Sequence, residues 1–122
     1  MQSHELKCAL QKHGGIAMAA DLDVTPSLSS LRELIIPDNE KMYWEEYAKF
    51  LTHLPTEIIE ELAAELLIWT QDLNWPGCKQ IVDKINSLPY PMKRKAVDAA
   101  RNRAQTEDDY EWIYNLNAVF DR

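Results

Sequence analysis

The chain has 122 residues, which is enough for one domain that buries its own core without disulfide or metal support. Apolar residues make up 46% of the chain and charged residues 27%, the composition of an ordinary globular protein. The net charge of −7 disfavours nucleic acid as a partner, because phosphates would be repelled. It suits a basic protein partner, or it simply keeps the protein soluble.

Two cysteines, Cys8 and Cys78, lie far apart without a CxxC or Cys/His cluster. A disulfide between them stays open, but two free or buried thiols fit a reducing compartment better. The N-terminal segment MQSHELKCALQKHGG lacks the apolar core of a signal peptide, and no apolar run reaches membrane length. We therefore expect a cytoplasmic protein that does not associate with membranes.

The first quarter of the chain shows a less regular helical pattern than the rest. A helix is predicted over residues 3–13, with Ser3 as its N-cap and the two glycines at 14–15 as its stop. Residues 16–24 fit either a short helix or an extended arm, and residues 25–30 are rich in turn formers, which predicts a linker. We therefore divide the chain into an N-terminal helix and linker extension, 1–30, and a helical domain, 31–122.

From Leu31 onwards, apolar residues recur at helical spacing and no alternating β pattern competes. Thr106 is expected to cap the last helix, with Asp109 completing a capping box. The predicted helices span residues 40–53, 56–71, 76–86, 92–104 and 110–120. Short connections favour antiparallel neighbours. The predicted class is all-α, with antiparallel helix pairs stacked as a short HEAT-like α-solenoid or as an irregular bundle.

The stretch IWTQDLNWPGC, residues 68–78, concentrates aromatic and polar side chains between two helices. One tryptophan falls on the buried stripe of the first helix and the other at the start of the second. Asn74 is the expected N-cap, and Gln71 and Asp72 are the expected acceptors for the indole N–H groups. The pattern predicts a helix–helix corner formed by Trp69, Asp72, Asn74, Trp75 and Pro76.

Residues 65–81, ELLIWTQDLNWPGCKQI, resemble the W-x-Q-D-x-N-W-P signature of a small bacterial family, domain of unknown function 5071. LIIPDN at 34–39 and DDYEWIYNLNAVF at 108–120 resemble the opening and closing segments of that family, so the resemblance covers about 31–120. It implies an all-helical fold reminiscent of HEAT-like repeats and no established activity. Some acidic helical proteins of this kind are encoded as immunity proteins beside secreted bacterial toxins.

No constellation of residues points to catalysis. The three histidines lie in unrelated segments, at positions 4, 13 and 53, without a metal-binding pattern. The glycines at 14–15 form too short a run for a phosphate loop. The acidic residues at 108–111 are explained by the dipole at a helix N-terminus. We predict no catalytic residue, no metal and no cofactor.

The charge pattern carries more information. Glu57, Glu61 and Glu65 recur every four residues along one face of a helix that has no lysine or arginine. A solvated face explains this row, and so does a surface for a cationic partner. The predicted partner-binding residues are Glu57, Glu60, Glu61, Glu65, Glu45, Glu46, Tyr43 and Tyr47. The segment 93–103, KRKAVDAARNR, carries a local charge of +4 but no interleaved aromatic residues, which is typical of an exposed helix face.

The sequence therefore favours a non-enzymatic protein-binding function. The leading hypothesis is an immunity protein that neutralises a cognate toxin with a basic surface, with no role for nucleic acid or membrane. The alternative hypothesis is a helical scaffold or regulatory adaptor in a cytoplasmic assembly. The oligomeric state stays open.

Overall fold

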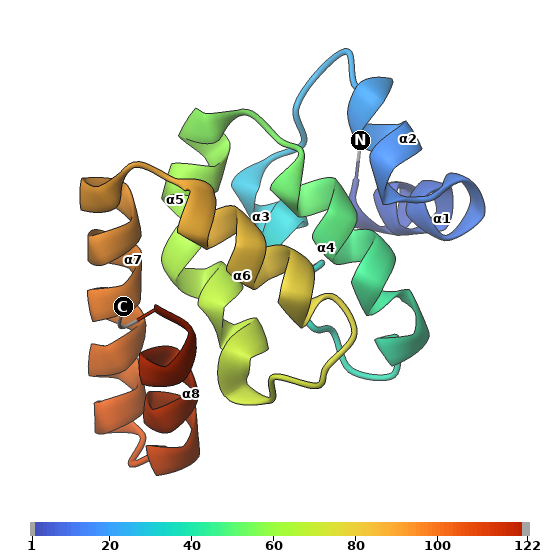
Figure 1. Cartoon of the computed structure of the whole chain (residues 1–122). Helices are drawn as coiled ribbons and strands as arrows, with labels where there is room; N and C mark the ends of the chain where they lie inside the picture. The colour runs from blue at the N-terminus through green and yellow to red at the C-terminus, as the bar shows by residue number, and fades with distance from the viewer. Residues whose placement is uncertain (1, 121–122) are drawn as a thin grey trace.

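The fold, taken from a computed structural model that describes residues 2–120, is built from helices connected by short loops (Figure 1). No strand occurs in these residues, so the predicted all-α class is confirmed. The helices are α1 (Ser3–His13), α2 (Gly15–Ala20), α3 (Leu28–Arg32), η1 (Lys41–Tyr43), α4 (Trp44–Thr52), α5 (Thr56–Leu66), η2 (Leu67–Gln71), α6 (Cys78–Ser87), α7 (Tyr90–Thr106) and α8 (Tyr110–Phe120).

The N-terminal segment contains more helix than its sequence predicts. The positive φ of 87° at Gly14 separates α1 from α2. Of the ambiguous stretch 16–24, residues 16–20 lie in the short helix α2 and residues 21–24 are not helical. The linker predicted at 25–30 is wrong in its second half. Ser27 accepts a hydrogen bond from the Ser30 backbone N–H at 3.2 Å and caps α3. Burial of Leu31 gives this short helix its tertiary support.

Helices two positions apart in the chain lie side by side. α2 packs on α4 and α4 on α6, while α3 packs on α5 and α5 on α7. α8 packs against α7 and against η2, and Figure 1 shows α7 and α8 as neighbours at one edge of the molecule. Within the all-α class, the HEAT-like solenoid stays a prediction.

The helix predicted over residues 56–71 is divided in two. α5 ends at Leu66, and the chain tightens into the 3₁₀ helix η2 before the extended residue Asp72. The Thr70 hydroxyl donates to the Leu67 carbonyl at 2.6 Å within this segment. A 3₁₀ segment rotates side chains by a larger angle per residue than an α-helix does. Trp69 and Thr70 both end up buried.

The cap predicted for α8 is also corrected. Thr106 is the last residue of α7, and its hydroxyl donates to the Asn102 carbonyl at 2.9 Å. Asp109 caps α8 instead, because its carboxylate accepts from the Trp112 backbone N–H at 3.1 Å. The positive φ of 53° at Asp108 turns the chain between the two helices, so the cap falls after that turn.

One apolar core runs through the described residues. It includes Leu6 and Leu10 from α1 as well as Trp69 and Trp112 from the second half of the chain, all fully buried. The N-terminal helices therefore contribute to the same core as the helices that follow them. Among the described residues, no helix combines the length and the hydropathy that crossing a membrane requires.

Candidate protein-binding surface

The indole groups of the corner use acceptors other than those expected. Trp69 is fully buried, and its Nε1 donates to the Pro76 carbonyl at 2.8 Å. Trp112 donates to the Thr70 hydroxyl at 2.9 Å and to the Leu67 carbonyl at 3.2 Å. Gln71 and Asp72 were predicted as acceptors, but they accept neither bond. The acceptors are instead the Leu67 carbonyl and the Thr70 hydroxyl, both in η2, and the Pro76 carbonyl in the loop that follows.

The loop between η2 and α6 is shaped by Asp72 and Gly77. Asp72 Oδ1 accepts from the Asn74 backbone N–H at 2.9 Å, which closes an Asx turn. Asn74 is not the N-cap of α6, because Gly77 occupies that position with a φ of 91°. A Cβ at Gly77 would lie 2.8 Å from Ala48 Cβ. The chain passes so close to α4 here that only glycine fits.

The second tryptophan of the corner packs the loop before α6 against α4. Trp75 is half-buried and meets the Trp44 ring edge-on, with 5.4 Å between ring centroids. The Trp44 indole donates to the Pro37 carbonyl at 2.9 Å. Pro76 is exposed, but its carbonyl anchors Trp69. Both tryptophans of the stretch are therefore held by contacts within the fold, Trp75 by Trp44 and Trp69 by the Pro76 carbonyl.

Tyr47 is removed from the predicted binding surface because its side chain is fully buried. Its hydroxyl donates to Glu40 Oε1 at 2.7 Å and accepts from Gln11 Nε2 at 2.9 Å. Lys7 Nζ lies 2.9 Å from the other oxygen of Glu40. Burial raises the pKa of Tyr47 well above its ordinary value, and the hydrogen bond to Glu40 adds to that shift. Tyr43 is half-buried beside it, at 6.4 Å between ring centroids.

The two glutamates at the start of α4 also have partners within the chain. Glu46 Oε1 accepts from the Gly15 backbone N–H at 2.9 Å, and Lys49 lies 3.3 Å from Oε2. The bond from Gly15 lowers the pKa of Glu46, more than burial raises it, and Lys49 lowers it further. Glu45 is exposed and accepts from Gln80 at 3.1 Å. Glu46 therefore joins α2 to α4 and is not part of an open acidic face.

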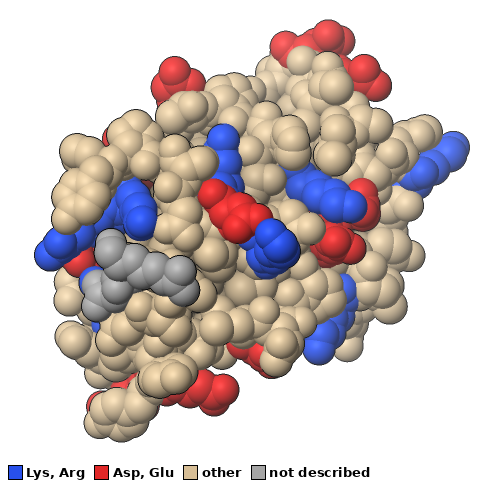
Figure 2. Space-filling view, in the orientation of Figure 1, with Lys and Arg blue, Asp and Glu red and all other residues tan. Residues whose placement is uncertain are grey.

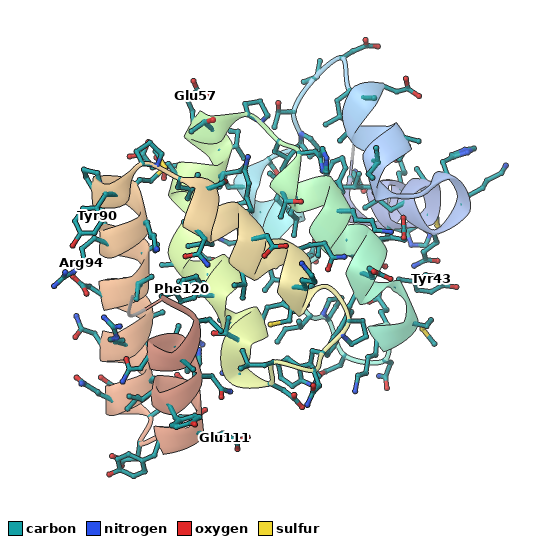
Figure 3. The ribbon with its side chains drawn as sticks, viewed as in Figure 1. Tyr43, Glu57, Tyr90, Arg94, Glu111 and Phe120 are labelled. Atoms are coloured by element: carbon teal, nitrogen blue, oxygen red, sulfur yellow. The ribbon has the colours of Figure 1, made fainter. Side chains whose placement is uncertain are left out.

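The glutamates on α5 differ in whether they have a partner within the chain. Arg32 Nε, from α3, lies 2.9 Å from each carboxylate oxygen of Glu65. Glu57, Glu60 and Glu61 are exposed and form no hydrogen bond or ion pair with the residues that the structure describes. Figure 3 shows Glu57 at the N-terminal end of α5. The three unpaired carboxylates, Glu57, Glu60 and Glu61, are called the α5 acidic face below.

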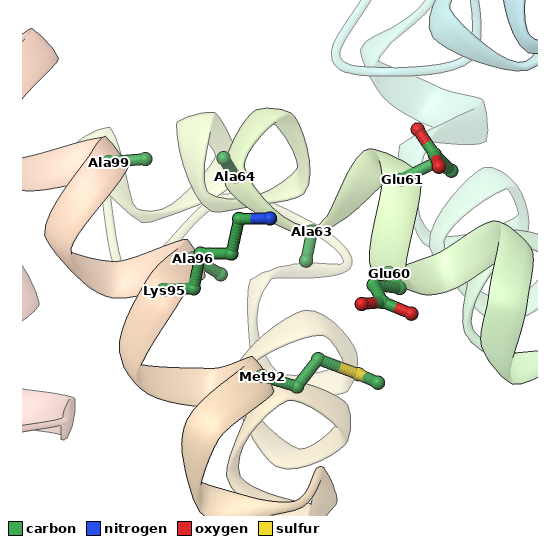
Figure 4. Close-up of a pocket in the computed structure, with 8 residues that line it drawn as sticks. All are labelled: Glu60, Glu61, Ala63, Ala64, Met92, Lys95, Ala96 and Ala99. Carbon is green, nitrogen blue, oxygen red and sulfur yellow. The ribbon is translucent and has the colours of Figure 1, made fainter.

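A groove of about 220 Å³ lies beside this face, between α5 and α7. Its charged and polarisable groups are Glu60, Glu61, Lys95 and Met92, and its floor is alanine: Ala63, Ala64, Ala96 and Ala99. In Figure 4, Lys95 and Met92 reach from α7 toward α5, and Glu60 turns toward the same gap. Sequence reasoning missed this groove, because its two walls are about thirty residues apart and only the fold joins them.

Three of the five basic residues on α7 are paired with carboxylates nearby in the sequence. Arg94 contacts Asp98 at 3.0 Å, Arg101 contacts the same carboxylate at 3.5 Å, and Arg103 contacts Glu107 at 2.9 Å. Figure 2 shows Lys and Arg side chains over α7 at the left edge, with both signs of charge interspersed across the rest of this side of the molecule. Since α5 packs on α7, the acidic and basic runs of the sequence are neighbours in the fold.

The two cysteines are the remaining side chains that could act as nucleophiles or metal ligands. Both thiols are free: Cys8 is exposed, with Sγ 3.7 Å from His4 Nε2, and Cys78 is buried. Burial raises the pKa of Cys78 to about 11, and the charge of Asp72 adds to the shift. No group of three or more His, Cys, Asp or Glu in residues 2–120 is arranged to hold a metal ion.

The comparison with known families gives one match. The family described as Domain of unknown function (DUF5071) matches residues 38–122. The chain belongs to this family. The match begins just before η1 and includes α4 to α8 together with the corner and the groove. The chain matches no curated protein and no solved structure.

Proposed function

We propose that this member of the DUF5071 family is a bacterial immunity protein that binds and neutralises a cognate toxin with a basic surface. The observation that carries the proposal is the α5 acidic face, on which Glu57, Glu60 and Glu61 lack partners among the described residues. Other carboxylates, including Glu40, Glu46 and Glu65, are bonded to groups of the same chain. Unpaired carboxylates are free to meet the cations of another protein.

Electrostatic physics supports an inhibitor of this kind. A chain with a net charge of −7 attracts a basic partner over a distance, and complementary charges raise association rates by roughly 10- to 1,000-fold. A toxin that acts on nucleic acid carries cations in its cleft for phosphate binding. Inhibition requires a rigid surface that covers such a cleft, and no chemical step. We place this function in the cytoplasm of the producing cell.

A second function is favoured by a separate observation. Three tyrosines of α7 and α8 have exposed side chains: Tyr90 at 68%, Tyr110 at 74% and Tyr114 at 73%. Tyrosine combines a large apolar ring with a polar tip and is enriched in the centres of protein interfaces. Figure 3 shows Tyr90 near Arg94 on the outer side of α7, and the Arg94 guanidinium donates to its hydroxyl at 3.1 Å. These rings fit the alternative, a scaffold or adaptor in a protein assembly.

Growth protection tests the proposal directly. The product of the reading frame directly upstream is expressed in a bacterial host with the wild type, or with Glu57→Lys, Glu60→Lys and Glu61→Lys combined. The wild type should restore growth and the triple variant should not. A matched control reverses three exposed glutamates elsewhere, Glu5, Glu33 and Glu111, and should still protect. A harmless upstream product, or equal protection by all three proteins, would reject the immunity function of the α5 acidic face.

A further inference from the structure

We propose that the groove between α5 and α7 receives an arginine side chain of the partner protein. The inference rests on the proposed function for the identity of that partner, but the groove can be tested without it. The residues that carry it are Glu60, Glu61, Met92 and Lys95 on the walls, above the alanine floor. A second groove, lined by Thr52, His53, Leu54, Gln80, Asp83 and Lys84, has one carboxylate, and that of Asp83 is paired with Lys79 at 2.7 Å.

The size of the groove favours a side chain over a small molecule. Its volume of about 220 Å³ is below the roughly 300–1,000 Å³ of typical small-molecule sites. It is also several times the roughly 30 Å³ that one water molecule occupies in the liquid. A single long side chain therefore fills the space better than a cofactor or one bound water.

The lining matches the two parts of an arginine. The methyl groups of the alanine floor offer an apolar surface for the three methylene groups of the arginine stem. The Met92 thioether adds a polarisable contact that adapts to a planar guanidinium. Glu60 and Glu61 supply carboxylate oxygens at the rim, and a guanidinium presents paired N–H donors to such oxygens. Arginine is also among the residues that dominate the binding energy of protein interfaces.

Lys95 gives this groove a charge that opposes the binding of a cation. Its side chain is exposed and reaches into the gap from α7, as Figure 4 shows, and its ammonium makes no hydrogen bond or ion pair with the described residues. The formal charge of the two glutamates and Lys95 together is −1. An incoming guanidinium is therefore repelled by Lys95, which must swing outward. Removing the charge of Lys95 should strengthen binding, an effect opposite to that of removing Glu60.

The experiment is an NMR titration of the isotope-labelled protein with the blocked tripeptide Gly-Arg-Gly. We expect a dissociation constant on the order of millimolar, since one side chain supplies few contacts. The shifts should be confined to the Met92 methyl group and to the backbone amides of the alanine floor. Gly-citrulline-Gly, which keeps the shape of arginine without its charge, should not bind.

Matched variants separate the groove from net charge. Glu60→Gln should weaken binding roughly 2- to 5-fold and Lys95→Gln should strengthen it by a similar factor, as expected for exposed ion pairs. Glu111→Gln and Lys12→Gln make the same charge changes on α8 and α1 and should have no effect. Binding of citrulline, shifts spread over the surface, or equal effects of Lys95→Gln and Lys12→Gln would overturn the proposal.

The outcomes also separate this inference from the proposed function. If the arginine peptide binds the groove but the chain fails to protect cells, the immunity function falls and the groove remains an arginine site. If the chain protects cells but the peptide leaves Met92 and the alanine floor unshifted, the arginine proposal is overturned and the acidic face acts without the groove.

Discussion

Trp69 is the residue on which the corner depends most. Its ring is fully buried, and its indole N–H bonds the carbonyl of Pro76 across the loop. Trp69→Ala should reduce the free energy of unfolding by roughly 3–5 kcal/mol, because a large cavity replaces the ring. Trp69→Phe should cost less, about 1–3 kcal/mol, because it mainly leaves the Pro76 carbonyl without its donor. Urea denaturation measures both, and an alanine variant as stable as the wild type would contradict this role.

Asp72 has two effects that different substitutions separate. Asp72→Ala removes the acceptor of the Asx turn and should destabilise the fold by about 0.5–2 kcal/mol. Asp72→Asn keeps an oxygen for the Asn74 N–H but removes the negative charge. Because burial first and Asp72 second raise the pKa of Cys78 to about 11, the asparagine variant should lower that pKa. Ultraviolet absorbance of the thiolate follows it, and an unchanged titration would show that burial alone sets the pKa.

At the residue scale, sequence reasoning recognises which side chains matter better than it recognises their partners. The helical spacing of Trp69 and Trp112 places both rings in the core. Their acceptors could not be predicted, because the 3₁₀ turn of η2 turns Leu67 and Thr70 toward Trp112 and the loop after it brings the Pro76 carbonyl to Trp69. Gly77 was missed, although the W-P-G sequence marks a turn there, because its close approach to α4 depends on tertiary packing.

At the scale of elements, α1 and α2 are held to α4 by two carboxylates, and one of them, Glu46, was predicted to bind a partner. Glu46 accepts from Gly15, and Glu40 accepts from Lys7 and Tyr47. The glycine is required because a Cβ at position 15 would overlap the Glu46 carbonyl oxygen. The existence of the helices followed from periodicity, but the bonds from Lys7 to Glu40 and from Gly15 to Glu46 join residues more than thirty positions apart. No local sequence pattern indicates such long-range contacts, so Glu46 and Tyr47 were assigned to an outer surface.

This docking should weaken in acid. Burial alone would raise the pKa of Glu40, but the bonds from Tyr47 and Lys7 and the charge of Lys7 lower it below 4.5, and that of Glu46 is lowered too. A lowered pKa in the folded state means stability that is present above the unfolded pKa and lost as pH falls through the folded one. Hydrogen exchange, corrected for intrinsic rates, should show α1 and α2 opening more readily below about pH 4.5 while α7 stays protected.

Two sets of variants test the same docking. Glu40→Gln with Glu46→Gln keeps oxygen acceptors but removes the titrating charges, so exchange in α1 and α2 should no longer change across this pH range. Gly15→Ala should open these helices at every pH, because the clash with Glu46 does not titrate. If protection of α1, α2 and α7 falls together in the wild type, acid acts on the whole fold instead of this contact.

At the scale of the molecule, the all-α class follows from the sequence, but the distribution of charge over the surface does not. The acidic run of α5 and the basic run of α7 look like separate poles in the sequence, yet the two helices pack together. Arg32 neutralises Glu65 from a third helix. Folding therefore removes Glu65 from the predicted acidic row and leaves Glu57 and Glu61, with the neighbouring Glu60, unpaired among the described residues. It also adds a groove with a lysine opposite them.

The reduced row leads to a sharper expectation for binding kinetics. Reversing Glu57, Glu60 and Glu61 to lysine should slow association with the toxin by roughly 10-fold or more, since steering depends on these charges. The rate for the wild type should fall steeply as salt rises, because exposed charges are screened, and the rate for the variant should fall less. Stability should stay within about 0.5 kcal/mol of the wild type, because the three carboxylates have no partner among the described residues.

Glu65→Lys provides the contrast within the same helix. It breaks the contact with Arg32 and sets two cations beside each other, so its cost should appear in the free energy of unfolding, at up to about 1 kcal/mol for an exposed pair. Its effect on association should be smaller than that of any one of the unpaired glutamates, because the Glu65 charge is already compensated. Stopped-flow association at low and high salt, with urea denaturation beside it, measures both quantities.

If Glu65→Lys slows association as much as Glu61→Lys does, only net charge steers the partner. If neither slows it, the binding surface lies elsewhere, and the exposed rings of Tyr110 and Tyr114 on α8 are the next residues to replace.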